Sequence, residues 1–168
     1  FEDGGRTVRS GPIRAALEAA RLAEANELLG YPWFISGTVI GGDKRGRTLG
    51  YPTANLKPDP ACGPAPGRYA VRVAAQGRRY GGVASFGRRP MFDAGVALLE
   101  AHLFDFSGDL YGQTIDVAFI AWIRPEQRFD SVAALVRQID DDARIAREAL
   151  ARAPDAFPAL GLVDTMGR

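Results

Sequence analysis

Five short segments between residues 33 and 123 show the two-residue hydrophobic alternation of half-buried β-strands, and no helical pattern separates them. In the last segment, alternate residues from Ile115 to Ile123 are apolar and share one face. Closely spaced strands without intervening helices predict an antiparallel barrel or sandwich rather than a parallel sheet. The predicted strands cover residues 33–40, 68–75, 79–86, 97–105 and 114–123.

A helix is predicted on each side of this β-rich region. Residues 12–29 should form the first, with Pro12 in its first turn, Gly30 at its end and an apolar stripe that includes Ile13 and Leu17. The second should begin at an N-cap, either Asp130 or Ser131. Its apolar residues recur at spacings of three and four, which predicts a face that packs on the sheet. The acidic run 140–142 is interpreted as a solvated face of this helix.

Composition limits the class of protein. The chain has 168 residues, 46% of them hydrophobic, and carries 21 Lys and Arg against 20 Asp and Glu. This balance favours a soluble domain that binds small ligands over a nucleic-acid binder. No apolar run approaches the roughly 18 to 20 residues of a membrane helix, and Cys62 and His102 are the single residues of their kinds. We expect a reduced, cytoplasmic setting and, because the chain starts at Phe1 without Met, a piece of a longer protein.

The connection after the first predicted strand is long, basic and rich in glycine. Residues 41–55 read GGDKRGRTLGYPTAN. Glycines let successive backbone amides point at an anion, while Thr53 and Asn55 offer hard oxygen ligands of the kind that Mg²⁺ accepts. By itself the basic loop could equally be a solvated turn, and PTAN a strand entry with an Asn turn. Their juxtaposition favours a Mg-nucleotide site, although no Walker motif occurs.

Two further segments could carry chemistry. Glu100 shares a strand face with Leu98, His102 and Phe104. It is either a residue of the solvent face or a general base at the barrel mouth. The segment IRPEQRF at 123–129 is either a plain connection to the helix or a clamp in which Arg124 holds a phosphate.

A family resemblance bears on these alternatives. The segments GTVIGGDKRGRTLGYPTANL, PGRYAVRV and GGVASFGRRPMF, followed by LEAHLFDFSGDLYGQTIDVAFIAWIRPEQRFDSVAALVRQIDDD, resemble in content and order the riboflavin kinase domain of bacterial bifunctional FAD synthetases. The likeness runs from about Phe34 to Leu150. Residues 9–30 resemble the last segment of the adenylyltransferase domain that precedes this kinase, although Gly11-Pro12 departs from the usual Ser-Ser-Thr-x-Ile-Arg stretch. Met91 departs from the Thr that the family more often has there.

The resemblance implies a mainly β fold, a six-stranded antiparallel Greek-key β-barrel with a long C-terminal helix and an N-terminal helix left from the preceding domain. It divides the chain into an adenylyltransferase remnant (1–32), a riboflavin kinase domain (33–152) and a tail (153–168). The implied activity is transfer of the γ-phosphate of ATP to riboflavin, giving FMN and ADP. FMN adenylylation is not expected, because a chain with one histidine lacks the His-x-Gly-His motif. The alternative is a non-catalytic flavin-binding barrel.

The resemblance also implies site residues. Glu100 would act as the general base, Thr53 and Asn55 would hold Mg²⁺, and Arg124 and Glu126 would belong to a loop over the flavin. The expected partners are riboflavin or FMN, ATP or ADP and, in the full-length protein, the adenylyltransferase domain. Neither nucleic acid nor membrane is expected, and self-association stays open. ATP would lie against Gly41, Gly42, Lys44, Arg45, Gly46, Arg47, Gly50, Pro52 and Thr53.

Overall fold

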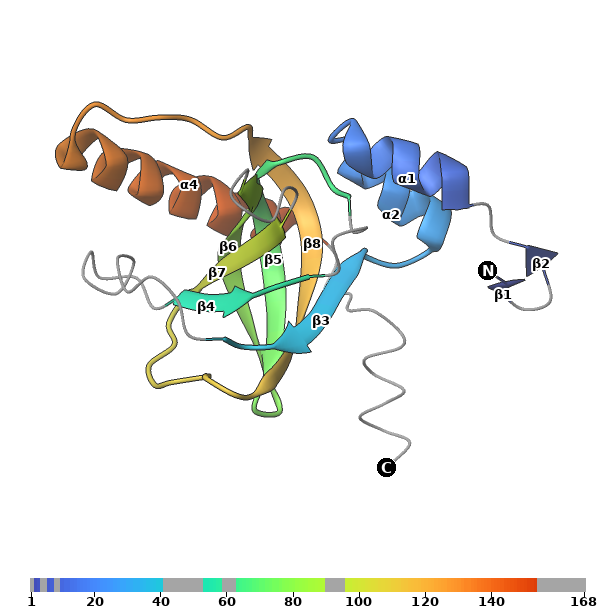
Figure 1. The fold of residues 1–168 in the computed structure, drawn as a ribbon, viewed down its shortest axis with the longest axis horizontal. Coiled ribbons are helices and arrows are strands. Elements are labelled where there is room, and N and C mark those ends of the chain that lie inside the picture. The colour runs from blue at the N-terminus through green and yellow to red at the C-terminus, as the bar shows by residue number, and fades with distance from the viewer. Residues whose placement is uncertain are drawn as a thin grey trace.

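The computed structural model describes residues 2–3, 6–7, 10–40, 53–58, 63–89 and 96–153. Its centre is a six-stranded antiparallel sheet that curls into a half-barrel, with two short helices on one side and one long helix on the other (Figure 1). The strands are β3 (Phe34–Thr38), β4 (Thr53–Leu56), β5 (Gly67–Ala75), β6 (Arg78–Arg89), β7 (Val96–Leu103) and β8 (Thr114–Arg124). The helices are α1 (Ser10–Glu18), α2 (Leu22–Leu29) and α4 (Val132–Arg152). Two short strands, β1 (Glu2–Asp3) and β2 (Arg6–Thr7), pair separately near the N-terminus.

The strand order in the main sheet is β3-β8-β5-β6-β7-β4, and every neighbouring pair is antiparallel. Two residues after β3 ends, Ile40 forms an isolated antiparallel bridge with Asn55 on β4, and the amide of Ile40 donates to the carbonyl of Asn55 at 2.8 Å. The expected six-stranded antiparallel fold is therefore confirmed. Alternation did not reveal β4, because three of its four residues are buried and the strand is too short to show a period.

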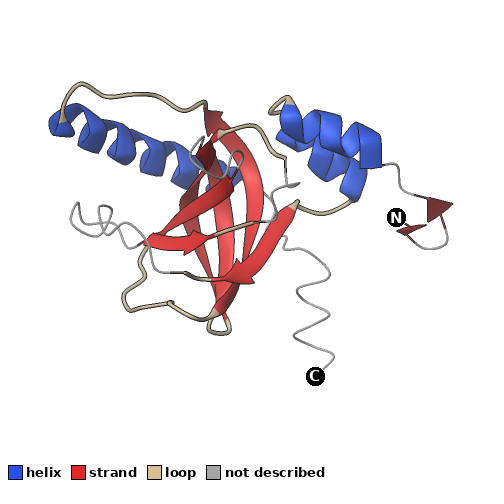
Figure 2. Ribbon diagram, viewed as in Figure 1, coloured by secondary structure: helices blue, strands red, loops and turns tan. Residues whose placement is uncertain are grey.

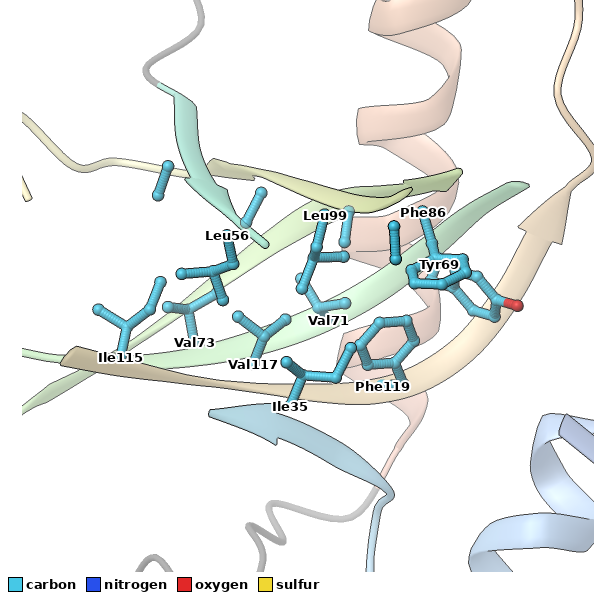
Figure 3. Packing of buried hydrophobic residues seen from close by; sticks show 14 of the residues in the cluster. Ile35, Leu56, Tyr69, Val71, Val73, Phe86, Leu99, Ile115, Val117 and Phe119 are labelled. Atoms are coloured by element: carbon cyan, nitrogen blue, oxygen red, sulfur yellow. The ribbon is translucent and has the colours of Figure 1, made fainter. Parts of the chain in front are cut away.

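The main core lies inside the curled sheet, where alternate residues of neighbouring strands interdigitate (Figure 3). Tyr69, Phe86 and Phe119 are the largest side chains with no more than 1% of their surface exposed. Tyr69 and Phe119 meet edge to face, with ring centroids 4.8 Å apart. Since alternate residues of a strand face opposite ways, burying these side chains fixes which residues point outward.

Helix α4 covers part of the outer face of the sheet (Figure 2). Its N-cap is Ser131, as the sequence indicated, and the Ser131 hydroxyl accepts a hydrogen bond from the amide of Ala134 at 3.1 Å. Near its other end, Leu150 lies directly over Gly81, where a Cβ atom would come within 2.8 Å of the leucine side chain. The interface is a small second core of Ala70, Val83, Phe104 and Ala146.

The single helix predicted over 12–29 is wrong, because the chain turns between α1 and α2. Ala20 adopts a left-handed conformation with a φ of 62°, and the amide of Arg21 donates to the carbonyl of Ala16 at 2.8 Å. The apolar stripe changes phase here, since the buried residues Leu17 and Leu22 are five positions apart. Only a break lets both halves bury their apolar faces.

The two helices pack against the half-barrel and contribute residues to its main core. Asn26 links them to the sheet, because its side chain donates to the carbonyl of Phe119 at 3.0 Å and accepts from the amide of Trp33 at 2.7 Å. In addition, the amide of Ala65 donates to the carbonyl of Leu17 at 2.9 Å. Among the described residues, no helix is long and apolar enough to cross a membrane.

Candidate active site

A line of polar residues crosses the outer face of the sheet. Asn55 on β4 is paired with Glu100 on β7, and Glu100 is paired with Ser85 on β6. Ser85 is paired with Arg68 on β5, which is paired with Arg124 on β8. Directly paired residues project from the same face of an antiparallel sheet, so these five side chains form one row, here called the polar row.

Thr53 lies beside the edge-strand end of the polar row and contacts the single histidine. Thr53 and His102 are directly paired, and 3.3 Å separates Thr53 Oγ1 from His102 Nδ1. Burial, together with the positive charge of Arg68, lowers the pKa of His102 to about 4. The imidazole is therefore neutral at pH 7, and one of its nitrogens can accept a hydrogen bond.

Asn55 is a buried polar side chain with an unused acceptor. Only 5% of its surface is exposed, and its Oδ1 atom has no hydrogen-bond partner within the described part of the chain. A buried carbonyl oxygen without a partner is costly, and it is also the ligand type that Mg²⁺ prefers. With Thr53 two residues earlier and Glu100 directly opposite, this donor set fits a hard divalent cation.

Arg124 closes the other end of the polar row and has a partner that the sequence did not reveal. Its Nε and Nη2 atoms donate to the two carboxylate oxygens of Asp142 at 2.9 and 2.8 Å. The side chains of Arg124 and Asp142 are only 13% and 4% exposed. The acidic run 140–142 was interpreted as a solvated face, and for Asp142 this is wrong. Asp142 lies on the apolar side of α4, three residues after Ile139 and four before Ala146, and that spacing was the available signal.

A cleft of about 480 Å³ opens between Arg68 on the sheet and the start of α4. The Nε atom of Arg68 is buried and has no hydrogen-bond partner in the described ranges. Burial and the charge of Arg124 lower the pKa of Arg68, whereas Asp142, Glu100 and Glu126 act in the opposite direction. The remaining lining residues are Gln127, Phe129, Asp130, Ser131, Val132 and Leu135.

Glu126 leads from β8 toward this cleft and lies over Gly87. A Cβ atom at Gly87 would come within 2.5 Å of Glu126 Oε1, so glycine is what allows the carboxylate to approach β6. Arg124 also lies against the ring of Phe129, with 5.7 Å between the guanidinium carbon and the ring centroid. The segment 124–129 is thus joined to β6 through Glu126 and to α4 through Arg124.

Among the site residues predicted from the sequence, Thr53, Asn55 and Glu100 lie together on neighbouring strands, and Arg124 and Glu126 lie toward the other end of the polar row. Asp142, Ser85 and Arg68 were not predicted. The outward positions on β5 could have been found from the alternation of RYAVRV. Eight predicted ATP-contacting residues lie outside the described residues: Gly41, Gly42, Lys44, Arg45, Gly46, Arg47, Gly50 and Pro52. Met91 lies outside them as well.

The matching family model and the curated relatives agree with one another. A family model described as riboflavin kinase (flavokinase) matches residues 29–150. The bifunctional riboflavin kinase/FMN adenylyltransferase of Haemophilus influenzae is 44% identical over 141 residues, which are 83% of this chain and 46% of that protein. The protein of the same description from Escherichia coli K12 is 44% identical over 149 residues, 88% of this chain and 48% of its own length. The chain therefore spans about half the length of these curated relatives.

Two solved structures are similar to this fold. A crystal structure described as a macrolide-efflux protein from Streptococcus pneumoniae has a TM-score of 0.78 and 41% identity, covering 88% of this chain and 49% of its own. The crystal structure of riboflavin kinase from Trypanosoma brucei has a TM-score of 0.53 and 24% identity, covering 73% of this chain and 82% of its own. At that identity the second likeness shows the fold alone.

Proposed function

The chain belongs to the riboflavin kinase family, whose domain uses ATP to phosphorylate riboflavin to FMN, and we propose that the polar row carries out this reaction. The γ-phosphate of Mg-ATP is transferred to the 5′-hydroxyl of the ribityl chain, giving FMN and ADP. The single observation that carries the proposal is the Oδ1 atom of Asn55, which has no hydrogen-bond partner among the described residues and lies directly beside Glu100. A passive flavin-binding barrel has no use for a cation site next to a carboxylate.

Thr53 and Asn55 would hold the Mg²⁺ ion through hydroxyl and amide oxygens. When bound, the ion neutralises charge on the transferring phosphoryl group, which together with positioning dominates catalysis of phosphoryl transfer. Within this site, neutral His102 holds the Thr53 side chain on the face of the sheet that carries Glu100.

Glu100 would act as the general base. Its carboxylate accepts the proton of the ribityl 5′-hydroxyl as that oxygen forms a bond to the γ-phosphorus, and the bond from phosphorus to the bridging oxygen of ADP breaks. Glu100 suits this role because it lies between the cation-binding pair on β4 and the cleft beside Arg68. A base of this kind contributes about 10²- to 10⁴-fold to the rate.

The order of strands indicates which end of the polar row would bind ATP and which end would bind the flavin. The connection 41–52, predicted to bind ATP, leaves β3 and enters β4, and its two ends are joined by the bridge between Ile40 and Asn55. The nucleotide would therefore approach from the β4 edge. The flavin would occupy the cleft at the opposite end of the polar row, where Arg124 and Glu126 belong to the covering segment.

In the full-length protein, residues 1–32 would connect this kinase to an adenylyltransferase domain, since the curated relatives carry both activities by name. The proposed boundaries are 1–32 for that connection, 33–152 for the kinase domain and 153–168 for a tail. We assign FMN adenylylation to that adenylyltransferase domain and not to residues 1–168.

The direct test is to incubate the fragment with riboflavin and Mg-ATP and to quantify FMN, ADP and FAD by chromatography. We expect FMN and ADP in equal amounts, no FAD, and no product in the presence of excess EDTA. Flavin binding without FMN formation would favour the non-catalytic barrel instead. Formation of FAD would contradict the assignment of adenylylation to the adenylyltransferase domain.

A further inference from the structure

We propose that Arg68 is a substrate-recognition residue, which donates a charged hydrogen bond from Nε to the C2 or C4 carbonyl oxygen of the flavin pyrimidinedione. The inference deepens the proposed function and rests on it. It starts from an arginine that lines the cleft and whose buried Nε atom has no hydrogen-bond partner among the described residues.

The unused donor requires an explanation. The Nε–H group of Arg68 is buried without a partner among the described residues, and leaving a charged donor unpaired in this way is costly. Asp142 is the carboxylate on the facing helix, but its two oxygens already accept from Arg124, and Oδ1 also accepts from Gln138 at 3.0 Å. A ligand acceptor in the cleft would satisfy the Nε–H group.

The position of Arg68 indicates which of the two substrates would supply this acceptor. Arg68 is two strands away from Glu100, with Ser85 between them, so the two backbones are separated by roughly 10 Å at the usual strand spacing of about 4.8 Å. A nucleotide that enters at β4 would place its phosphates on the far side of Glu100 from Arg68. The remaining ligand is the flavin, whose ribityl chain separates the reacting hydroxyl from the ring by several bonds.

The chemistry of the ring fits the donor. The isoalloxazine ring is neutral and largely apolar, and its acceptors N1, the C2 oxygen, the C4 oxygen and N5 lie on the side of the pyrimidinedione. The cleft provides apolar contacts from Phe129, Val132 and Leu135 together with the Arg68 guanidinium. An arginine keeps its charge at all accessible pH values, so the hydrogen bond would be charge-assisted.

The test measures binding rather than turnover. Riboflavin affinity is determined by fluorescence quenching in the presence of Mg-ADP for the wild-type fragment, Arg68→Met and Arg68→Lys, with ADP affinity measured alongside. We expect Arg68→Met to bind riboflavin roughly 10- to 100-fold more weakly, with ADP affinity unchanged and partial recovery in Arg68→Lys. Arg72→Met is the matched control, because Arg72 projects from the same face of β5 but donates to the carbonyl of Leu150 at 3.1 Å.

A second measurement needs no substitution in the protein. Riboflavin analogues with sulfur in place of the C2 or the C4 oxygen carry a weak acceptor at one position. We expect the wild-type fragment to bind at least one analogue more weakly, and Arg68→Met to discriminate less against it. The inference is overturned if folded Arg68→Met binds riboflavin within about twofold of wild type, or if the wild-type fragment binds both analogues as tightly as riboflavin. If the wild-type protein makes FMN, either of these results overturns only the role of Arg68, and the proposed function stands. If the wild-type protein neither binds nor phosphorylates riboflavin, the proposed function and the role of Arg68 are both overturned.

Discussion

Arg124 and Asp142 form a bidentate ion pair that joins the end of β8 to the middle of α4, with nitrogen-to-oxygen distances of 2.9 and 2.8 Å. The pair fixes the long helix over the outer face of the sheet and thereby sets one wall of the cleft beside Arg68. Gln138 donates to the same carboxylate from the preceding turn of α4. The interaction is buried, so its loss has consequences that a surface ion pair would not have.

Replacing Asp142 with alanine should destabilise the fold strongly. The substitution leaves the Arg124 guanidinium, which is 13% exposed, without its buried carboxylate, and breaking such a pair typically costs about 3 to 5 kcal/mol. Chemical denaturation measures the loss. Asp141→Ala is the matched control, because Asp141 is 59% exposed and lies 3.8 Å from Arg144; its effect should stay within about 0.5 kcal/mol. Equal effects of the two substitutions would contradict the role of the ion pair.

Glu100→Gln should lower kcat for FMN formation by about 10²- to 10⁴-fold. The amide keeps the size of the side chain but cannot take the proton of the ribityl hydroxyl. Steady-state assays with Mg-ATP and riboflavin measure the change, while ADP affinity should remain close to wild type. Glu148→Gln on the exposed face of α4 serves as the control. A Glu100→Gln fragment with nearly full turnover would rule out the base assignment.

Asn55→Leu should weaken metal binding without lowering the stability of the fold. Because the Oδ1 acceptor has no partner among the described residues, its removal should leave the Tm of the metal-free fragment unchanged or raise it. The affinity for Mg²⁺, measured through ADP binding, should fall by at least the roughly 10- to 100-fold that is typical of disturbed metal sites. Titration calorimetry and thermal denaturation give the two readouts. Unaltered Mg²⁺ affinity would remove Asn55 from the cation site.

Acidification should destabilise the fragment through His102. Its pKa is about 4 in the folded state against 6.5 in a model peptide, because of burial and then Arg68, with Asp142 acting in the opposite direction. Between these values the unfolded chain takes up a proton that the folded chain does not, so the free energy of unfolding falls as pH drops from 6.5 toward 4 and loses nothing further from this group below 4. The full contribution is about 3 kcal/mol at 1.36 kcal/mol per pKa unit.

His102→Gln provides the comparison for this pH dependence. Unfolding at pH 7, 6 and 5 should show a steeper loss for wild type than for the variant, with the largest difference at pH 5. Parallel profiles for the two proteins would show that His102 is not the titrating group.

Asn26→Leu should destabilise the fragment by about 1 to 3 kcal/mol. The substitution leaves the amide of Trp33 and the carbonyl of Phe119 without the side chain that now bonds both. Glu27→Leu, at an exposed position of the same helix, is the control for a change of helix composition. Denaturation midpoints of both variants measure the effect. If Asn26→Leu is as stable as the control, α2 does not stabilise the half-barrel through this residue.

Much of the fold, and the central residues of the candidate site, could be predicted from the sequence. The alternation of apolar and polar residues located β3 and the four strands from β5 to β8, because a half-buried strand shows a hydrophobic period of two residues in the sequence. It missed β4, whose residues from Ala54 to Leu56 are buried in succession, and the break at Ala20, where only a phase change in the apolar stripe marks the turn. Thr53, Asn55 and Glu100 were identified from their chemistry and from a family resemblance.

Pairing and burial were decided by the tertiary structure alone. By itself the sequence determined which residues alternate, which segments carry residue types suited to binding ions and which family the chain resembles, because these properties depend on neighbours along the chain. It could not place Glu100 between Asn55 and Ser85, since strand register is set by the packing of the whole core. Nor could it pair Asp142 with Arg124, or show that Asn55 Oδ1 and Arg68 Nε are buried atoms without a hydrogen-bond partner among the described residues. Those relationships arise only when the sheet curls and α4 packs on its outer face.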